Sequence, residues 1–113
     1  MKRDLTELNK LERYLRDNNI QYQRMDADDS LYGISLYGIY DRHQICVPCY
    51  DAGEREWDAI CQRGSYGAEE GLLEICGNIV SENAEDSVVE GYLTADDVIE
   101  RIERQKLDSE VVR

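Results

Sequence analysis

Four cysteines and one histidine are the side chains in this sequence best suited to hold a metal ion or to do covalent chemistry. Cys46 and Cys49 form a Cys-x-x-Cys pair, His43 precedes it, and Cys61 and Cys76 follow it. Such a pair is a common half of a zinc site, which needs four nitrogen or sulfur ligands in a tetrahedron. The second half has no matching close pair, because Cys61 and Cys76 lie fifteen residues apart.

The other interpretation of these cysteines is that they are buried as small apolar side chains. A hairpin centred near Gly53 brings Cys46 across from Cys61, a contact that needs no metal. The pair at Cys46 and Cys49 also lacks the helix N-terminus that lowers a thiol pKa for redox catalysis. We therefore expect free, non-catalytic thiols and no cofactor. The alternative is a small metal- or ligand-binding domain that uses Cys46, Cys49, Cys61 and Cys76.

Two further features invite a chemical interpretation and favour a structural one. Glycines in the segment 64–67 (Gly-Ser-Tyr-Gly) suit a phosphate cradle, but Glu69 and Glu70 follow and would repel an anion. Adjacent acids at Asp96 and Asp97 are explained by a helix N-terminus alone. Since the single histidine has no recognisable nucleophile beside it, we predict no catalytic residues and a protein that is not an enzyme.

Negative charge is the dominant property of the chain, and it is unevenly distributed. The formal net charge is −12. Residues 1–50 carry 7 basic and 8 acidic side chains, whereas residues 51–113 carry 6 basic and 17 acidic ones. No Lys or Arg lies between Arg63 and Arg101. The carboxylates of that span are the predicted partner-binding residues: Glu69, Glu70, Glu74, Glu82, Glu85, Asp86, Glu90, Asp96, Asp97 and Glu100.

This charge distribution argues against two classes of partner and favours a third. Direct nucleic-acid binding needs a positive surface, and an anionic membrane would repel this chain in the same way. The natural complement is a basic protein, such as a nuclease or another nucleic-acid-binding effector. The alternative is that the acidity only keeps a structural or regulatory subunit soluble.

Length and hydropathy predict one domain, residues 1–113, because this size is typical of a single core. No run of about eighteen apolar residues suggests a membrane span. The charged N-terminal residues 1–7 lack the apolar stretch of a secretion signal. We therefore expect a cytoplasmic protein, working in the host cell cytosol, whose cysteines stay reduced.

The first half of the chain predicts one helix and one strand. Four leucines recur every three or four residues and define a helix over residues 4–18: Leu5, Leu8, Leu11 and Leu15. Asp4 and Glu7 have the spacing of a capping box. Residues 20–25 alternate as in a half-buried strand, which the Asp-rich segment 26–30 is expected to end.

Next come a short tandem repeat and a hairpin. Residues 31–40 repeat the unit Leu-Tyr-Gly-Ile, typical of an irregular or bulged strand. Residues 43–50 and 57–62 are the expected arms of the hairpin, and residues 51–54 its turn. Pro48 cannot donate a ladder hydrogen bond, so the first arm is predicted to be an edge or to bulge there.

The last third predicts a helix, a strand and a second helix. The helix is expected to begin at Ser65, with its apolar stripe made of Ala68, Leu72, Ile75, Cys76 and Ile79. An acidic loop leads to a strand over residues 88–93. Thr94 and Asp97 then form a capping box for the final helix. The expected fold is α+β, with helices packed on one face of a small, mainly antiparallel sheet in the order α-β-(β)-β-β-α-β-α.

Several blocks between residues 41 and 103 resemble a group of small acidic proteins from phages and mobile elements of Firmicutes. The blocks are Asp41-Arg42-His43-Gln44-Ile45, Trp57-Asp58-Ala59-Ile60-Cys61, Gly64-Ser65-Tyr66-Gly67, Glu70-Gly71-Leu72-Leu73-Glu74 and the stretch from Glu90 to Val98. The resemblance transfers no catalytic residue. It implies an accessory role such as counter-defence, and a DNA-mimic-like, anti-CRISPR type of inhibitor fits the acidity.

Overall fold

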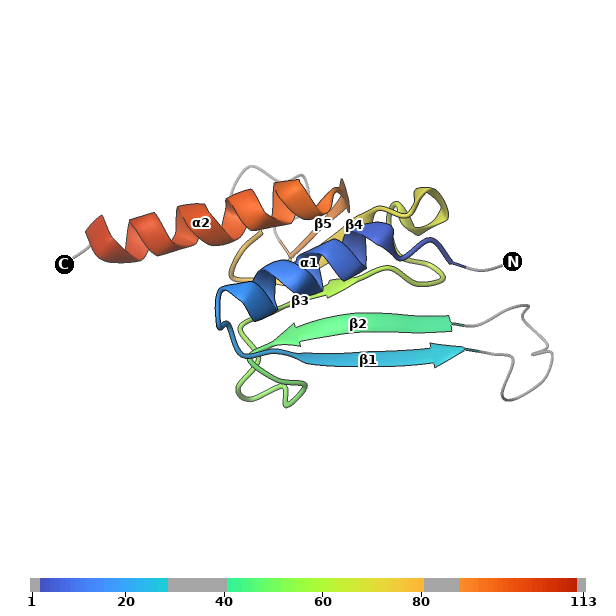
Figure 1. The fold of residues 1–113 in the computed structure, drawn as a ribbon, viewed down its shortest axis with the longest axis horizontal. Coiled ribbons are helices and arrows are strands. Elements are labelled where there is room, and N and C mark those ends of the chain that lie inside the picture. Colours follow the sequence, from blue (N-terminus) through green and yellow to red (C-terminus); the bar gives the residue numbers. More distant parts are fainter. Residues whose placement is uncertain (1–2, 29–40, 81–87, 112–113) are drawn as a thin grey trace.

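Two helices cover one face of a five-stranded antiparallel sheet in the computed structural model, which describes residues 3–28, 41–80 and 88–111 (Figure 1). The elements are α1 (Thr6–Asp17), β1 (Gln23–Asp28), β2 (Asp41–Val47), β3 (Trp57–Ile60), the 3-10 turn η2 (Ala68–Glu70), β4 (Leu73–Gly77), β5 (Val89–Leu93) and α2 (Ala95–Val111). The predicted α+β class and its mainly antiparallel sheet are confirmed. Both the tandem repeat at 31–40 and the acidic loop 82–87 lie outside the described residues.

The strands follow one another in the sheet in the order of the sequence, β1-β2-β3-β4-β5. Ile45 pairs with Ala59, and Ala59 pairs with Ile75, so three neighbouring strands place an apolar row on the same face. That row is fully buried. Because side chains alternate along each strand, the residues between these positions point away from the helices.

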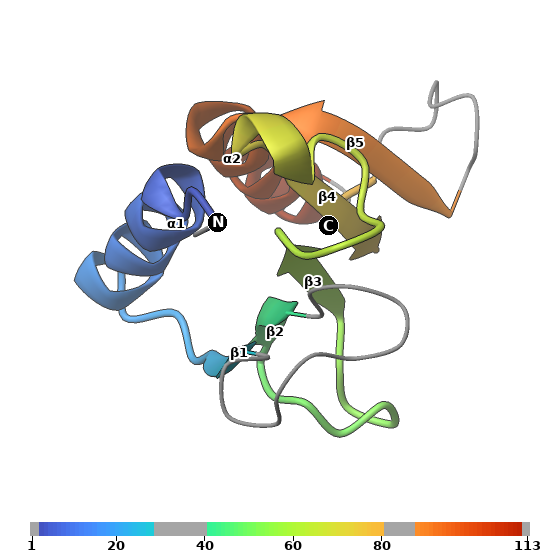
Figure 2. The same ribbon diagram turned by 90° about the vertical axis from the view of Figure 1, so that its right-hand side faces the viewer.

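The predicted leucine stripe of the first helix covers this apolar row. Leu8, Leu11 and Leu15 are fully buried, while Leu5 packs at the margin of the core. The second helix contributes Val98 and Ile102. Figures 1 and 2 show α1 and α2 next to each other on the same side of the sheet.

The N-terminus of α2 has the predicted capping box. The Thr94 N–H donates to Asp97 Oδ2 (2.9 Å), and the Asp97 N–H donates to Thr94 Oγ1 (3.1 Å). The box predicted for the first helix is wrong in its second half. Asp4 does accept from the Thr6 N–H (3.0 Å), but Glu7 accepts from the Ala95 N–H (2.7 Å) at the start of α2. The acid that was expected to cap its own helix therefore caps its neighbour.

The predicted helix from Ser65 is wrong, because the chain forms only the short turn η2 and then strand β4. Leu73 and Ile75 alternate with half-buried Glu74 and Cys76, which is the period of a strand. Gly71 and Gly77 bound this segment with φ values of +76° and +112°, outside the right-handed helical region. The apolar spacing fitted both periods over so short a run.

Two expectations about the first strands are also corrected. β1 extends through Asp26, where a break was expected, and this carboxylate forms an ion pair with Arg24 and a hydrogen bond with His43. The first hairpin arm, β2, lies between β1 and β3 and is not an edge. It ends at Val47, so Pro48 stays outside the ladder. The predicted turn is present, with the Gly53 N–H bonded to Asp51 Oδ1 (2.9 Å).

No helix within the described ranges is long and apolar enough to cross a membrane.

Trp57 is the largest aromatic side chain in the core, and its removal should be costly. It is 5% exposed, and Gly77 on β4 packs so closely that a Cβ there would lie 2.7 Å from the Trp57 Cα. We expect Trp57→Ala to lower the free energy of unfolding by about 3–5 kcal/mol in chemical denaturation. Leu107→Ala, at a side chain that is 61% exposed, is the control and should change it by less than about 0.5 kcal/mol. Equal effects would place Trp57 outside the core.

Candidate functional site

The cysteines lie on both sides of the sheet. Cys46 pairs with Asp58, and Asp58 pairs with Cys76, so this row faces away from the helices. Cys61 belongs to the core beneath the helices, where its Sγ donates to the Asp4 carbonyl (3.6 Å). Cys46 was expected to face Cys61, but the register places Asp58 opposite Cys46.

This arrangement separates the candidate zinc ligands. All four cysteines are free thiols, and Cys49 donates to Glu54 in the loop after β2. Burial raises the pKa of Cys46 and raises that of Cys61 to about 11, so both remain protonated at neutral pH. In the part of the chain that the structure describes, no three His, Cys, Asp or Glu side chains are grouped closely enough to hold a metal ion.

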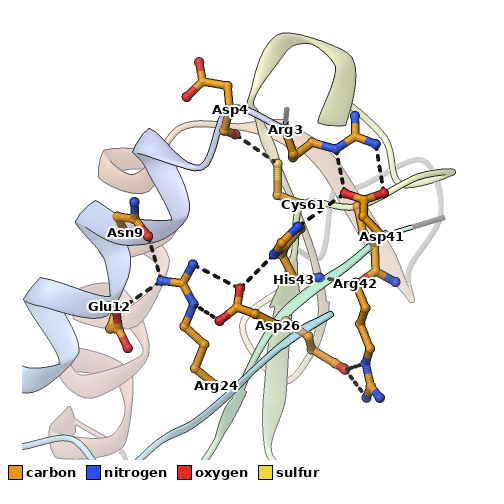
Figure 3. Close-up of polar contacts among 12 residues, drawn as sticks. Arg3, Asp4, Asn9, Glu12, Arg24, Asp26, Asp41, Arg42, His43 and Cys61 are labelled. Atoms are coloured by element: carbon orange, nitrogen blue, oxygen red, sulfur yellow. Dashed lines mark hydrogen bonds and ion pairs between the residues drawn. The ribbon is translucent and has the colours of Figure 1, made fainter. Parts of the chain in front are cut away.

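His43 lies in a polar cluster at one end of the core, between two carboxylates (Figure 3). Its Nδ1 is 2.7 Å from Asp26 Oδ1, and its Nε2 is 3.5 Å from Asp41 Oδ2. Arg3 binds Asp41 through two parallel hydrogen bonds of 2.9 and 3.0 Å. Both ring nitrogens of His43 face carboxylates, and its side chain is 11% exposed. Its role is to join β1, β2 and the N-terminal segment.

Arg24 extends the same cluster to α1. Its guanidinium contacts Asn9 (2.7 Å), Glu12 (3.1 Å) and Asp26 (3.0 Å) (Figure 3). Burial raises the pKa of Asp26, but hydrogen bonds from His43 and Arg24 outweigh it and leave the pKa below its usual value. Charged groups in this cluster therefore stabilise one another inside the fold.

The same balance holds at Asp41, the most enclosed carboxylate of the cluster. Burial raises its pKa, and the hydrogen bonds from Arg3 and from the Arg63 backbone N–H together lower it below the usual value. The Arg63 N–H donates to Asp41 Oδ1 at 2.9 Å. Asp41 thus fixes both the N-terminal segment and the start of the loop after β3.

Most of the predicted partner-binding carboxylates that the structure describes already have a partner within the protein. Glu82, Glu85 and Asp86 lie outside the described residues. Five of the other seven have internal partners. Glu74 accepts from the Tyr66 N–H, and Asp97 caps Thr94. The remaining three form ion pairs: Glu90 with Arg101, Asp96 with Lys10 and Glu100 with Arg104.

Glu69 and Glu70 are the exception, and they lie on η2 at the edge of a cleft of about 320 Å³. Both are exposed. Within the described ranges, neither carboxylate has a hydrogen-bond or ion-pair partner, although Glu69 acts on Arg3 through space. Arg3, Arg63 and residues 64–68 complete the lining together with Tyr92. The expected helix N-terminus does not exist at this loop, so the Gly-Ser-Tyr-Gly segment forms a cleft wall instead.

An aromatic pair dominates the cleft. Tyr66 and Tyr92 are 58% and 61% exposed, and their rings stack with centroids 6.3 Å apart. The Tyr92 N–H donates to the Tyr66 carbonyl (3.2 Å), which joins β5 to the loop after β3. Figure 2 shows this loop and η2, drawn in yellow-green and yellow, beside the end of β5 and the start of α2. The sequence indicates the loop but not the aromatic pair, because Tyr66 and Tyr92 meet only through the fold.

The backbone at Tyr92 is unusual. Leu73 pairs with Leu93, and Ile75 pairs with Glu90. Two residues of β5, Gly91 and Tyr92, therefore lie opposite the single β4 residue Glu74. Such a bulge re-aims a side chain. Tyr92 has a φ of +60°, a left-handed conformation that is an outlier for a bulky residue. The strain is therefore associated with the outward placement of an aromatic ring.

Comparisons with known proteins return no match to any family model, curated protein or solved structure.

The polar cluster should make stability depend on pH. Because the pKa values of Asp26 and Asp41 are lowered in the folded state, their contribution is complete above the unfolded value of about 4 and is lost as the pH falls through the folded values. We expect Asp41→Asn to lower the Tm at pH 7, and the gap to wild type to narrow below about pH 4. Thermal denaturation across this range, with the exposed Asp17→Asn as control, checks it. A Tm difference between Asp41→Asn and wild type that does not change with pH would contradict a stabilising role for the ionised Asp41 carboxylate.

At most positions an alanine variant is more stable than a glycine variant, and the left-handed backbone at Tyr92 should reverse this order of stability. Left-handed geometry costs an L-residue about 1–2 kcal/mol, which glycine avoids. We expect Tyr92→Gly to be more stable than Tyr92→Ala by about 1 kcal/mol in chemical denaturation. At Tyr66, whose φ is not positive, Tyr66→Ala should be the more stable variant. If the alanine variant were the more stable one at both positions, the backbone at Tyr92 would not be strained.

Proposed function

We propose that this chain is a non-enzymatic acidic binding protein that engages a basic, nucleic-acid-handling protein of the host. The observation that carries the proposal is the span from Arg63 to Arg101, which holds ten carboxylates and no internal Lys or Arg. Duplex DNA presents about one negative charge per 1.7 Å of its axis. A dense acidic surface can therefore compete for the same basic groove.

The described side chains support this proposal in one respect. Carboxylates such as Glu90 and Asp96 are occupied by the protein's own cations, whereas Glu69 and Glu70 are exposed and unpaired among the described residues. The net charge of −12 adds a long-range field that steers a basic partner toward the chain. Unpaired carboxylates beside exposed aromatic rings then offer specific contacts at close range.

The resemblance to phage and mobile-element proteins suggests the biological setting. An acidic accessory factor of this kind fits counter-defence, with a nuclease or effector of anti-CRISPR type as its target. Inhibition would follow from occupying the groove that the target uses for nucleic acid. The competing reading, acidity for solubility alone, predicts no such partner.

Capture from a host lysate followed by competition tests the proposal. We expect the immobilised protein to retain a basic protein at roughly 50 mM salt and to release it at roughly 500 mM, because salt screens exposed charges. The purified partner should then lose duplex DNA when this protein is added. A partner that binds equally at both salt concentrations, or that keeps its DNA, would contradict the proposal.

A matched pair of charge reversals tests the site. Glu69→Lys with Glu70→Lys should weaken partner affinity about tenfold, since each reversed charge meets a cationic surface. Asp17→Lys with Glu56→Lys changes the net charge by the same amount at exposed positions away from the cleft and should weaken it much less. Thermal denaturation confirms that both fold. Equal affinity of the two variants would reduce the acidic span to solvated surface.

A further inference from the structure

We propose that the Tyr66–Tyr92 cleft is the anchor point of this binding protein and that it takes an arginine side chain of the partner. The inference rests on the proposed function and deepens it by naming the contact. It joins four features of one place: an aromatic pair, unpaired carboxylates, a small cavity and a closely packed backbone.

The aromatic pair offers the surface that a guanidinium prefers. Tyr66 and Tyr92 are both more than half exposed, and their rings are offset-stacked with an interplanar angle of 29°. A planar guanidinium stacks on such rings, whereas a compact, strongly hydrated ammonium does so less well. The protein itself uses this contact elsewhere, since the guanidinium carbons of Arg42 and Arg55 lie 5.1 and 5.0 Å from the centroid of Tyr50.

The charges that line the cleft favour a cation. Glu69 and Glu70 supply two carboxylates, and a carboxylate accepts two parallel hydrogen bonds from a guanidinium. Arg3 also lines the cleft, but Asp41 binds it through two hydrogen bonds and offsets its charge. The two glutamates then outweigh the one other cation of the lining, Arg63.

The size of the cleft is sufficient for a single side chain. Its volume of about 320 Å³ is at the lower limit of small-molecule pockets, which span about 300–1,000 Å³. The cleft has room for one arginine side chain that a basic partner inserts between the tyrosines and the glutamates. Tyrosine and arginine are also the residue types enriched at the energetic centres of interfaces.

Close backbone packing fixes the positions from which the two tyrosine side chains extend. A Cβ on Gly91 would lie 2.3 Å from the Tyr66 Cβ, and one on Gly67 would lie 3.0 Å from the Tyr92 Cα. The bulge and the hydrogen bond from Tyr92 to Tyr66 complete this tight contact. A preformed site loses less conformational entropy when it binds, so a single anchor can be effective.

Two peptides of equal charge test the anchor directly. One carries four arginines separated by glycines, the other four lysines, and both are capped at their ends. We expect wild-type protein at low salt to bind the arginine peptide about three- to tenfold tighter by calorimetry. Tyr66→Leu with Tyr92→Gly should abolish that preference and leave lysine-peptide affinity unchanged. Tyr50→Leu, which removes a ring already flanked by the protein's own arginines, should keep the preference.

The outcomes separate this inference from the proposed function. If both peptides bind wild type equally, or if the double variant keeps the arginine preference, the anchor is wrong while charge-driven binding stands. Loss of the preference in Tyr50→Leu would also overturn the anchor, because the responsible ring would lie elsewhere. If neither peptide binds at low salt, both proposals fail.

Discussion

Burial of the apolar rows of the sheet beneath α1 and α2 is the interaction on which the other features depend. Ile45, Ala59 and Ile75 form such a row across three strands, and the leucines of α1 cover it. In the part of the chain that the structure describes, both helices lie on this face of the sheet and contact each other. That proximity is why Glu7 on α1 meets the first N–H groups of α2 at Ala95.

Polar groups at the edge of this core fix the N-terminal segment and the loop after β3. Asp41 holds Arg3 and the Arg63 backbone, while His43 and Asp26 tie β1 to β2. The cluster contains histidine and acids, the residue types of many active sites, but its groups bind one another, and His43 and Asp41 are largely enclosed. Its chemistry is that of a structural network, in which each charge reduces the cost of burying its neighbour.

The acidity of the chain therefore has two parts. Many carboxylates, among them Asp26 and Glu90, form ion pairs or helix caps within the protein. Glu69 and Glu70 are not, and they stand next to the exposed tyrosine pair and a backbone held in a left-handed conformation at Tyr92. An aromatic surface, free charge and preformed geometry occur together there, which is the combination that recognition of a basic partner requires.

The sequence by itself determined the elements whose signals are local. The leucine period gave α1, the Thr94–Asp97 box gave the start of α2, and Asp51 with Gly53 marked the hairpin turn, because capping and turn formation depend on residues a few positions apart. Segment 73–77 was decided only by the tertiary structure. Its apolar residues fitted a helix as well as a strand, and hydrogen bonds to β3 and β5, distant in sequence, selected the strand.

The candidate site follows the same division. The excess of carboxylates was visible in the sequence, since charge needs no fold to be counted. Which of them remain free was decided by cations brought close in space, as Lys10 is to Asp96. The meeting of Tyr66 with Tyr92 was likewise set by a bulge and a loop that touch only after the sheet has formed, so no spacing along the chain could have revealed it.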